Sequence, residues 1–115
     1  MNFEFILSVA KDLVLVACYV YIISNANQTL YIGMTVDLVR RMIQHKNGTF
    51  RNNFTRRYNF DRLVYFEEST DRAAAARREK QLKGWTRARK VAPITAMNPE
   101  WQDLSSKWDD PLCLR

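Results

Sequence analysis

Two short β-type segments, each carrying a tyrosine, constrain this chain more than any other feature. Residues 20–23 and 31–33 consist of residue types that favour strands, and the Asn-rich residues 24–28 between them favour a turn. The pattern predicts a β-hairpin. Tyr21 and Tyr31 lie on its two strands, so we expect their phenol hydroxyls to come close together.

The strand and helix that surround this hairpin follow from the apolar pattern. Residues 13–23 are nearly all apolar, which is typical of a strand buried on both faces. Thr35 is a plausible N-cap for a helix that ends near residues 47–48. Its apolar residues recur at spacings of three and four, which predicts an amphipathic helix with an apolar stripe of Val36, Val39, Met42 and Ile43.

A third strand and a second helix follow in the second half. Residues 62–67 favour a strand. Thr70 and Asp71 open a helix for which Gly84 suits the C-terminal cap. The order β-β-α-β-α-α predicts one small α+β domain.

Two prolines guide the prediction for the last part of the chain. Thr86 is a possible N-cap of a short helix, and Pro93, which has no backbone N–H, is expected to end or kink it. Asn98 followed by Pro99 predicts the start of another short helix through Leu104. We place the folded domain at residues 15–105, with an extension at 1–14 and a tail at 106–115.

Positive charge is concentrated in the middle of the chain. The net charge is +6, and residues 36–90 hold 15 Lys and Arg against 6 Asp and Glu. This indicates a polyanionic partner, with a solubilising surface as the alternative. Residues 49–59 alternate cations with aromatic rings, and such a loop either grips phosphates and stacks bases or folds its rings onto the core.

Glu79 is the most informative single position. On the helix after Asp71, the spacing of Ala75, Glu79 and Leu82 places the carboxylate on or beside the apolar stripe. An inward carboxylate is costly unless it has a partner. Glu79 is therefore either paired with one of the many arginines or serves as a metal ligand or catalytic carboxylate.

Cysteine usage and hydropathy bear on the location of the protein. Cys18 lies in an apolar run and is expected to be a buried thiol, and with Cys113 it makes no disulfide framework. This composition suits a reducing, cytoplasmic setting. The apolar run at residues 13–23 is too short to span a bilayer, so we expect no membrane role. No segment indicates an obligate protein partner.

Several motifs, taken in order, resemble the GIY-YIG nuclease family, and more closely its small stand-alone bacterial members. The resemblance covers residues 17–104 and rests on these segments: Tyr19-Val20-Tyr21 in place of Gly-Ile-Tyr, Tyr31-Ile32-Gly33, Arg41 with His45, Glu79 within residues 78–85, and Asn98-Pro99-Glu100-Trp101. The resemblance implies a three-stranded antiparallel sheet and divalent-metal-dependent cleavage of DNA phosphodiester bonds.

The resemblance also implies roles for individual residues. Glu79 would hold Mg²⁺ or Mn²⁺, and Arg41 would clamp the scissile phosphate. Tyr31 would act as the base and Tyr21 would position the water, while His45 would lie near the phosphate. A phenol that acts as a base needs nearby positive charge to lower its pKa. Arg41 and His45 also have plainer interpretations, as a helix-surface ion pair with Asp37 and as a surface histidine.

The expected function is a DNA endonuclease that acts on structured or single-stranded DNA in repair or processing. The expected partner is DNA, with RNA as the alternative partner. The alternative is a nucleic-acid-binding module without turnover. The cations expected to contact nucleic acid are Arg40, Arg51, Arg56, Arg57, Lys80 and Lys83.

The sequence departs from the family pattern at three positions. Tyr19 replaces the first glycine of the motif, and Met34 stands where some relatives have a lysine, so a cation near the base is missing there. Pro93 interrupts the region after the glutamate helix. Asn98 is not expected to be catalytic.

Overall fold

A computed structural model describes residues 17–47, 59–106 and 108 of the chain. Its sheet has three antiparallel strands in the order β2-β1-β3. β1 (Cys18–Ser24) and β2 (Leu30–Thr35) form the predicted hairpin, and β3 (Arg62–Ser69) pairs with the other edge of β1. The carboxamide oxygen of Asn25 accepts hydrogen bonds from the backbone N–H groups of Asn27 and Thr29, which explains why this Asn-rich segment turns.

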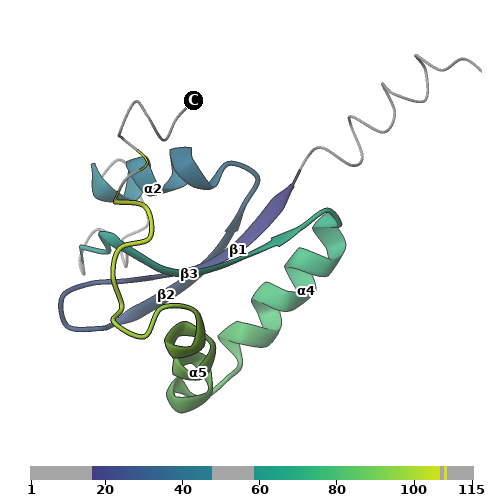
Figure 1. The fold of residues 1–115 in the computed structure, drawn as a ribbon. Coiled ribbons are helices and arrows are strands. Elements are labelled where there is room, and N and C mark those ends of the chain that lie inside the picture. The colour runs from purple at the N-terminus through teal and green to yellow at the C-terminus, as the bar shows by residue number, and fades with distance from the viewer. Residues whose placement is uncertain (1–16, 48–58, 107, 109–115) are drawn as a thin grey trace, which may run out of the picture.

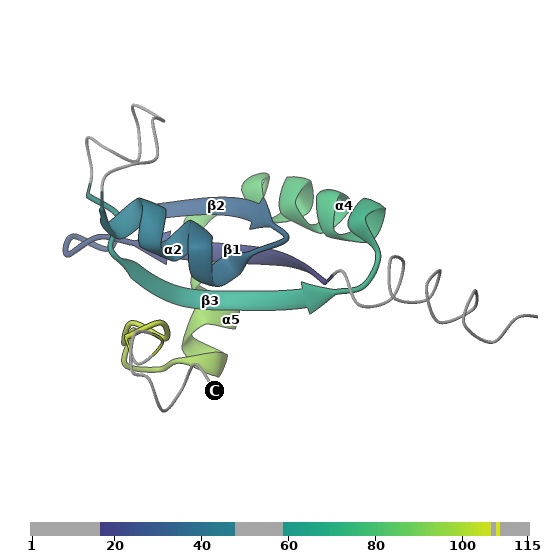
Figure 2. The same cartoon turned by 90° about the horizontal axis from the view of Figure 1, so that it is seen from above.

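Helices cover both faces of the sheet (Figures 1 and 2). α2 (Leu38–Lys46) lies on one face, and α4 (Arg72–Lys83) and α5 (Arg87–Met97) lie on the opposite face. The element order β-β-α-β-α-α and the three-stranded antiparallel sheet confirm the predicted α+β fold.

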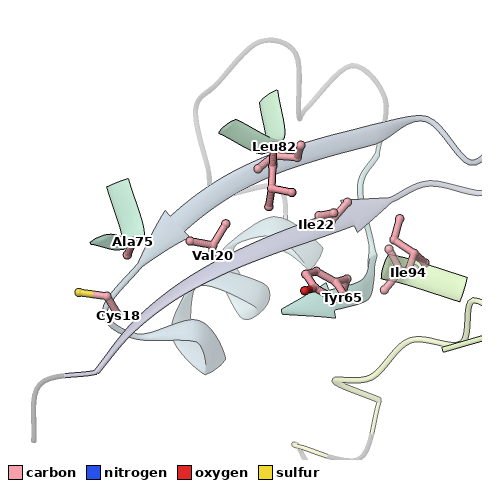
Figure 3. Packing of buried hydrophobic residues seen from close by; sticks show 9 residues of the cluster. Cys18, Val20, Ile22, Tyr65, Ala75, Leu82 and Ile94 are labelled. Atoms are coloured by element: carbon pink, nitrogen blue, oxygen red, sulfur yellow. The ribbon is translucent and has the colours of Figure 1, made fainter. Parts of the chain in front are cut away.

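Strand alternation divides the buried side chains into two cores. Val20 and Ile22 of β1 face α4 and α5, where they pack with Ala75, Leu82 and Ile94 (Figure 3). The intervening β1 residues face α2 and form the second core, which contains Tyr21, Ile23, Leu38, Met42, Phe60 and Leu63. The predicted buried thiol of Cys18 belongs to the first core and is 2% exposed. Tyr21 therefore lies on the α2 face of the sheet.

A bulge in β3 is stabilised by the chain that follows α5. The register shifts so that Ile22 pairs with Tyr65 and Ile23 pairs with Leu63. The Val64 carbonyl between these pairs accepts a hydrogen bond of 3.3 Å from the side chain of Asn98. This partner satisfies a buried carbonyl that the bulge places outside the regular ladder.

The predicted apolar stripe of α2 is wrong in its phase. Asp37, not Thr35, caps the helix, with its carboxylate accepting a hydrogen bond from the Arg40 N–H, and Thr35 ends β2. The buried α2 residues are Leu38, Met42 and His45. Of the predicted stripe only Met42 is buried, whereas Val36, Val39 and Ile43 are 47%, 38% and 42% exposed. The contact of His45 with the sheet turns the helix away from the predicted face.

The prediction for Pro93 and the segment after it is also wrong in part. Thr86 caps α5 as predicted, but the helix continues through Pro93 to Met97. Ile94, directly after the proline, is fully buried, and its packing offsets the hydrogen bond that proline removes. Asn98 ends α5 and starts no new helix, because its carboxamide binds the backbone N–H and carbonyl of Gln102 and closes a turn. Trp101 and Leu104 pack on the cores, as predicted.

Candidate active site

Tyr21 lies directly across the sheet from Gly33. The two residues are register partners in β1 and β2. A Cβ atom placed on Gly33 would lie 2.5 Å from the Tyr21 ring carbon that bears the hydroxyl, so any side chain there would collide with the phenol. The glycine therefore provides the space in which the fully buried Tyr21 ring lies.

The Tyr21 hydroxyl is within hydrogen-bonding distance of His45. The distance from this oxygen to His45 Nε2 is 3.2 Å, and the histidine is 6% exposed. Burial, together with the positive charge of Arg41, lowers the pKa of His45 to about 4. The imidazole is thus neutral at neutral pH. The interpretation of His45 as a surface residue is wrong, because its side chain is buried between α2 and the sheet.

Tyr31 joins the same group of rings from β2. Its ring centroid lies 5.8 Å from that of His45 and 5.8 Å from that of Phe60, just before β3. The pair with His45 has the T-shaped arrangement that aromatic rings prefer, and the pair with Phe60 is tilted at 44°. Tyr31 is half-buried, unlike Tyr21. The hairpin therefore brings the rings of both tyrosines to one histidine, and of the two tyrosines only Tyr31 has access to solvent.

The pKa of Tyr21 shows which charged groups act on this buried phenol. Burial raises it to about 12, and a hydrogen bond and the positive charge of Arg41 act in the opposite direction. The charges of Tyr31 and Glu79 are smaller contributions in the upward direction, and the value of about 12 is the net result. Burial outweighs Arg41, so Tyr21 keeps its proton at neutral pH and holds the guanidinium by a neutral hydroxyl. The base that needs a lowered pKa is not Tyr21.

Glu79 approaches the site from α4, on the other side of the sheet. Ala75 and Leu82, on the same stripe of α4, are buried, while Glu79 keeps 25% of its side chain exposed. Its carboxylate lies 3.5 Å from the ammonium group of Lys83, one turn further along the helix. The ion-pair partner of Glu79 is therefore a lysine and not one of the arginines that the sequence suggested. The pair is weak because Lys83 is exposed to solvent.

The donor set at this position suits a metal ion that keeps most of its water. Within the described ranges there is no group of three acidic, histidine or cysteine side chains that would enclose a metal. Mg²⁺ commonly binds through one or two carboxylates together with substrate phosphates and waters. A half-exposed single carboxylate at Glu79 fits that mode of binding and does not fit a closed structural site.

The predicted nucleic-acid-binding residues are only partly described. Arg40, Lys80 and Lys83 are exposed on α2 and α4. Arg51, Arg56 and Arg57 fall outside the described residues. Arg40 and Arg41 line one surface hollow of about 220 Å³, and of these two cations Arg41 acts on the buried Tyr21.

The sequence alone did not indicate two further residues of this region, Gly33 and Arg72, as parts of the site. Gly33 was part of the motif, and its position opposite a tyrosine in the hairpin is the signal that would have identified it. Arg72, the first residue of α4, lines a second hollow with Arg41. Thirty-one positions separate these two arginines, and only the fold brings them together.

The fold and this polar cluster together define a small α+β domain whose site is built on a tyrosine hairpin. The profile described as the GIY-YIG catalytic domain matches residues 17–92. The chain belongs to the GIY-YIG family of nucleases.

Several relatives share most of their length with this chain. The UPF0213 protein of Syntrophus aciditrophicus is 34% identical over 82 residues, which cover 71% of this chain and 93% of the relative. The UPF0213 protein of Desulfotalea psychrophila is 36% identical over 80 residues, covering 70% and 73%. The solution NMR structure of the UPF0213 protein of Bacillus halodurans matches with a TM-score of 0.50 and 26% identity, over 81% of this chain and 97% of that one. This likeness supports the same α+β fold.

The hydropathy of the helices bears on a membrane location. In the part of the chain that the structure describes, no helix has the length and apolar character needed to cross a bilayer.

Proposed function

We propose that this protein is a divalent-metal-dependent endonuclease that hydrolyses phosphodiester bonds in DNA. One observation carries the proposal: a single phenol, Tyr21 of β1, is under the influence of Arg41, Tyr31, His45 and Glu79, which come from one further strand and two helices. Hydrolysis of a phosphodiester requires a cation for the phosphate, a base for the water and electrostatic stabilisation of the transition state. The cluster contains a residue suited to each task.

The site has an inner and an outer layer. Tyr21 and His45 are buried and form the inner layer, while the half-exposed Tyr31, Arg41 and Glu79 form the outer layer. Only the outer layer is accessible to a nucleic acid. We assign the chemistry to Tyr31, Arg41 and Glu79, and positioning to Tyr21 and His45.

Each outer residue has a distinct task. Arg41 binds two oxygens of the scissile phosphate through its planar guanidinium and offsets the charge that develops there. General-base catalysis by Tyr31 needs its phenolate, which accepts the proton of the attacking water and becomes the neutral phenol. Glu79 would hold Mg²⁺ or Mn²⁺, which supplies Lewis-acid stabilisation of the phosphate when bound.

The inner layer fixes the orientation of Arg41. The neutral Tyr21 hydroxyl contacts both Arg41 and His45. The imidazole of His45 is also neutral, so it does not compete with Arg41 for the phosphate. Holding the guanidinium in one geometry reduces the entropy lost when the substrate binds.

Cleavage by purified protein tests the proposal. Wild type, Arg41→Gln and Arg77→Gln would be incubated with labelled single-stranded, duplex, flap and branched DNA, and with RNA, in EDTA, Mg²⁺ or Mn²⁺. Arg77 is an exposed cation of α4, so its replacement is a matched loss of charge. We expect metal-dependent cutting of DNA that Arg41→Gln loses and Arg77→Gln keeps. Binding without cutting by all three proteins would favour the non-catalytic module instead.

A further inference from the structure

Two adjoining hollows meet at Arg41. One, of about 260 Å³, is lined by Cys18, Met34, Thr35, Val36, Arg41 and Arg72. The other, of about 220 Å³, is lined by Thr35, Val36, Asp37, Arg40, Arg41 and Gln44. They share Thr35, Val36 and Arg41, while Arg72 lines only the first hollow and Arg40 only the second. Each volume is several times the share of one water molecule in the liquid, about 30 Å³, and accommodates a hydrated phosphate.

The charge that lines these hollows is one-sided. They contain three arginines and one carboxylate, that of Asp37, which accepts a hydrogen bond of 3.0 Å from the Arg40 backbone as the cap of α2. Within the described residues, Arg40 and Arg72 make no ion pair, whereas Arg78, also on α4, is held by Glu67 through several hydrogen bonds. Arg40 and Arg72 are thus available to a soluble anion.

The position of Arg72 has no evident benefit for folding. It begins α4, where the helix dipole disfavours a cation, and the neighbouring carboxylate of Asp71 caps the helix by accepting from the Ala73 N–H and forms no ion pair with Arg72 among the described residues. A residue that breaks a local preference without a compensating contact is a candidate for a functional role. Because Arg72 lines the same hollow as Arg41, this role is expected to be the binding of an anion there.

We propose that Arg72 binds the phosphate next to the scissile one, so that Arg41 and Arg72 hold two consecutive phosphates of the bound strand. The inference rests on the proposed role of Arg41 at the scissile phosphate. The strand then crosses the end of β2, from the first turns of α2 toward the start of α4, and Arg40 lines the adjoining hollow.

Binding of short single-stranded DNA to Arg72→Gln, measured by fluorescence anisotropy at several salt concentrations, tests the contact. A Glu79→Gln background prevents cutting, and Arg77→Gln on the same helix is the control. We expect a loss of about tenfold in affinity at low salt. The salt slope should fall by about 0.7, the value for one phosphate contact on a single strand. Equal affinity and slope for the Arg72 and Arg77 variants would overturn the proposal.

Neutral methylphosphonates placed one at a time around the cleavage site locate the phosphate. At one neighbour of the scissile phosphate, the neutral group should abolish the difference between wild type and Arg72→Gln. Met34 lines the same hollow, so Met34→Lys should restore affinity to Arg72→Gln. Coupling at no position would overturn the assignment even if the protein cuts DNA. If the protein binds DNA without cutting it, only the nuclease proposal fails. The affinity and the salt slope then still show whether Arg72 contacts a phosphate.

Discussion

Gly33 and Tyr21 are register partners across the hairpin, and the tyrosine ring occupies the volume that a side chain on Gly33 would need. The ring in turn supports Arg41 and His45 through its hydroxyl. A glycine on a β-strand thus determines where a guanidinium on a helix lies.

Gly33→Ala is expected to displace the Tyr21 ring, because the new methyl group collides with the phenol. Overpacking of this kind costs about 1–3 kcal/mol of unfolding free energy. Cleavage should fall more than stability explains, since Arg41 loses its support. Urea denaturation and single-turnover rates measure the two effects. Gly84→Ala, at the solvent-exposed end of α4 where a Cβ has ordinary contacts, is the control. Wild-type activity of Gly33→Ala would show that the ring position is unimportant.

Tyr21→Phe removes the hydroxyl and keeps the ring. Because the Tyr21 pKa is about 12, the residue does not ionise near neutral pH, and its loss should leave the shape of the pH–rate profile unchanged. The rate should fall by about 10²-fold, the size of loss that follows from misplacement of a catalytic group such as Arg41. Tyr31→Phe removes the proposed base and should reduce the rate more than Tyr21→Phe does. A greater loss in Tyr21→Phe than in Tyr31→Phe would exchange the two roles.

Acid should destabilise the protein through His45. Its pKa is near 6.5 when unfolded and about 4 when folded, so the folded state binds fewer protons between these values. Stability is complete above pH 6.5, declines as the pH falls through this window, and loses up to about 3 kcal/mol below pH 4. Urea unfolding at pH 7, 5.5 and 4 measures this loss. His45→Gln should flatten the pH dependence in that window, and an unchanged slope in the variant would assign the acid sensitivity to other groups.

Asn98→Ala should reduce stability without affecting the chemistry. The variant loses hydrogen bonds to the backbone of Gln102 and Val64, and it leaves a buried carbonyl unsatisfied at the β3 bulge. The expected cost is about 1–3 kcal/mol. Thermal unfolding and the cleavage rate at a temperature where both proteins are folded separate these effects. A selective loss of rate would give Asn98 a role at the site that its position does not suggest.

Much of the fold follows from short-range patterns in the sequence. The hairpin depends on β-formers around an Asn turn, and the ends of α4 and α5 depend on caps at Asp71, Gly84 and Thr86. Such signals involve neighbouring residues and need no knowledge of tertiary packing.

The errors lie where tertiary contacts override the local pattern. In α2 the contact between His45 and Tyr21 buries a polar residue and leaves Val39 and Ile43 exposed, which apolar periodicity cannot anticipate. In α5 the burial of Ile94 carries the helix past Pro93.

For the site, the order of motifs predicted Tyr21, Tyr31, Arg41, His45 and Glu79 as site residues, but two features follow only from the tertiary structure. Tyr21 is fully buried, which is why we propose a positioning role for it. Arg72 meets Arg41 only because α4 begins near the end of β2. The roles of the individual site residues remain predictions.

The dependence of cleavage on Glu79 tests the proposed nuclease most directly. Single-turnover rates of wild type, Glu79→Gln and Glu100→Gln would be compared at saturating DNA across a series of Mg²⁺ and Mn²⁺ concentrations. Glu100 is an exposed glutamate after α5 and serves as the matched control. Loss of a metal ligand removes several kcal/mol of transition-state stabilisation, so we expect Glu79→Gln to be slower by about 10²-fold or more, with DNA affinity kept. Equal metal-dependent rates for the two variants would contradict the assignment of Glu79 as the catalytic carboxylate.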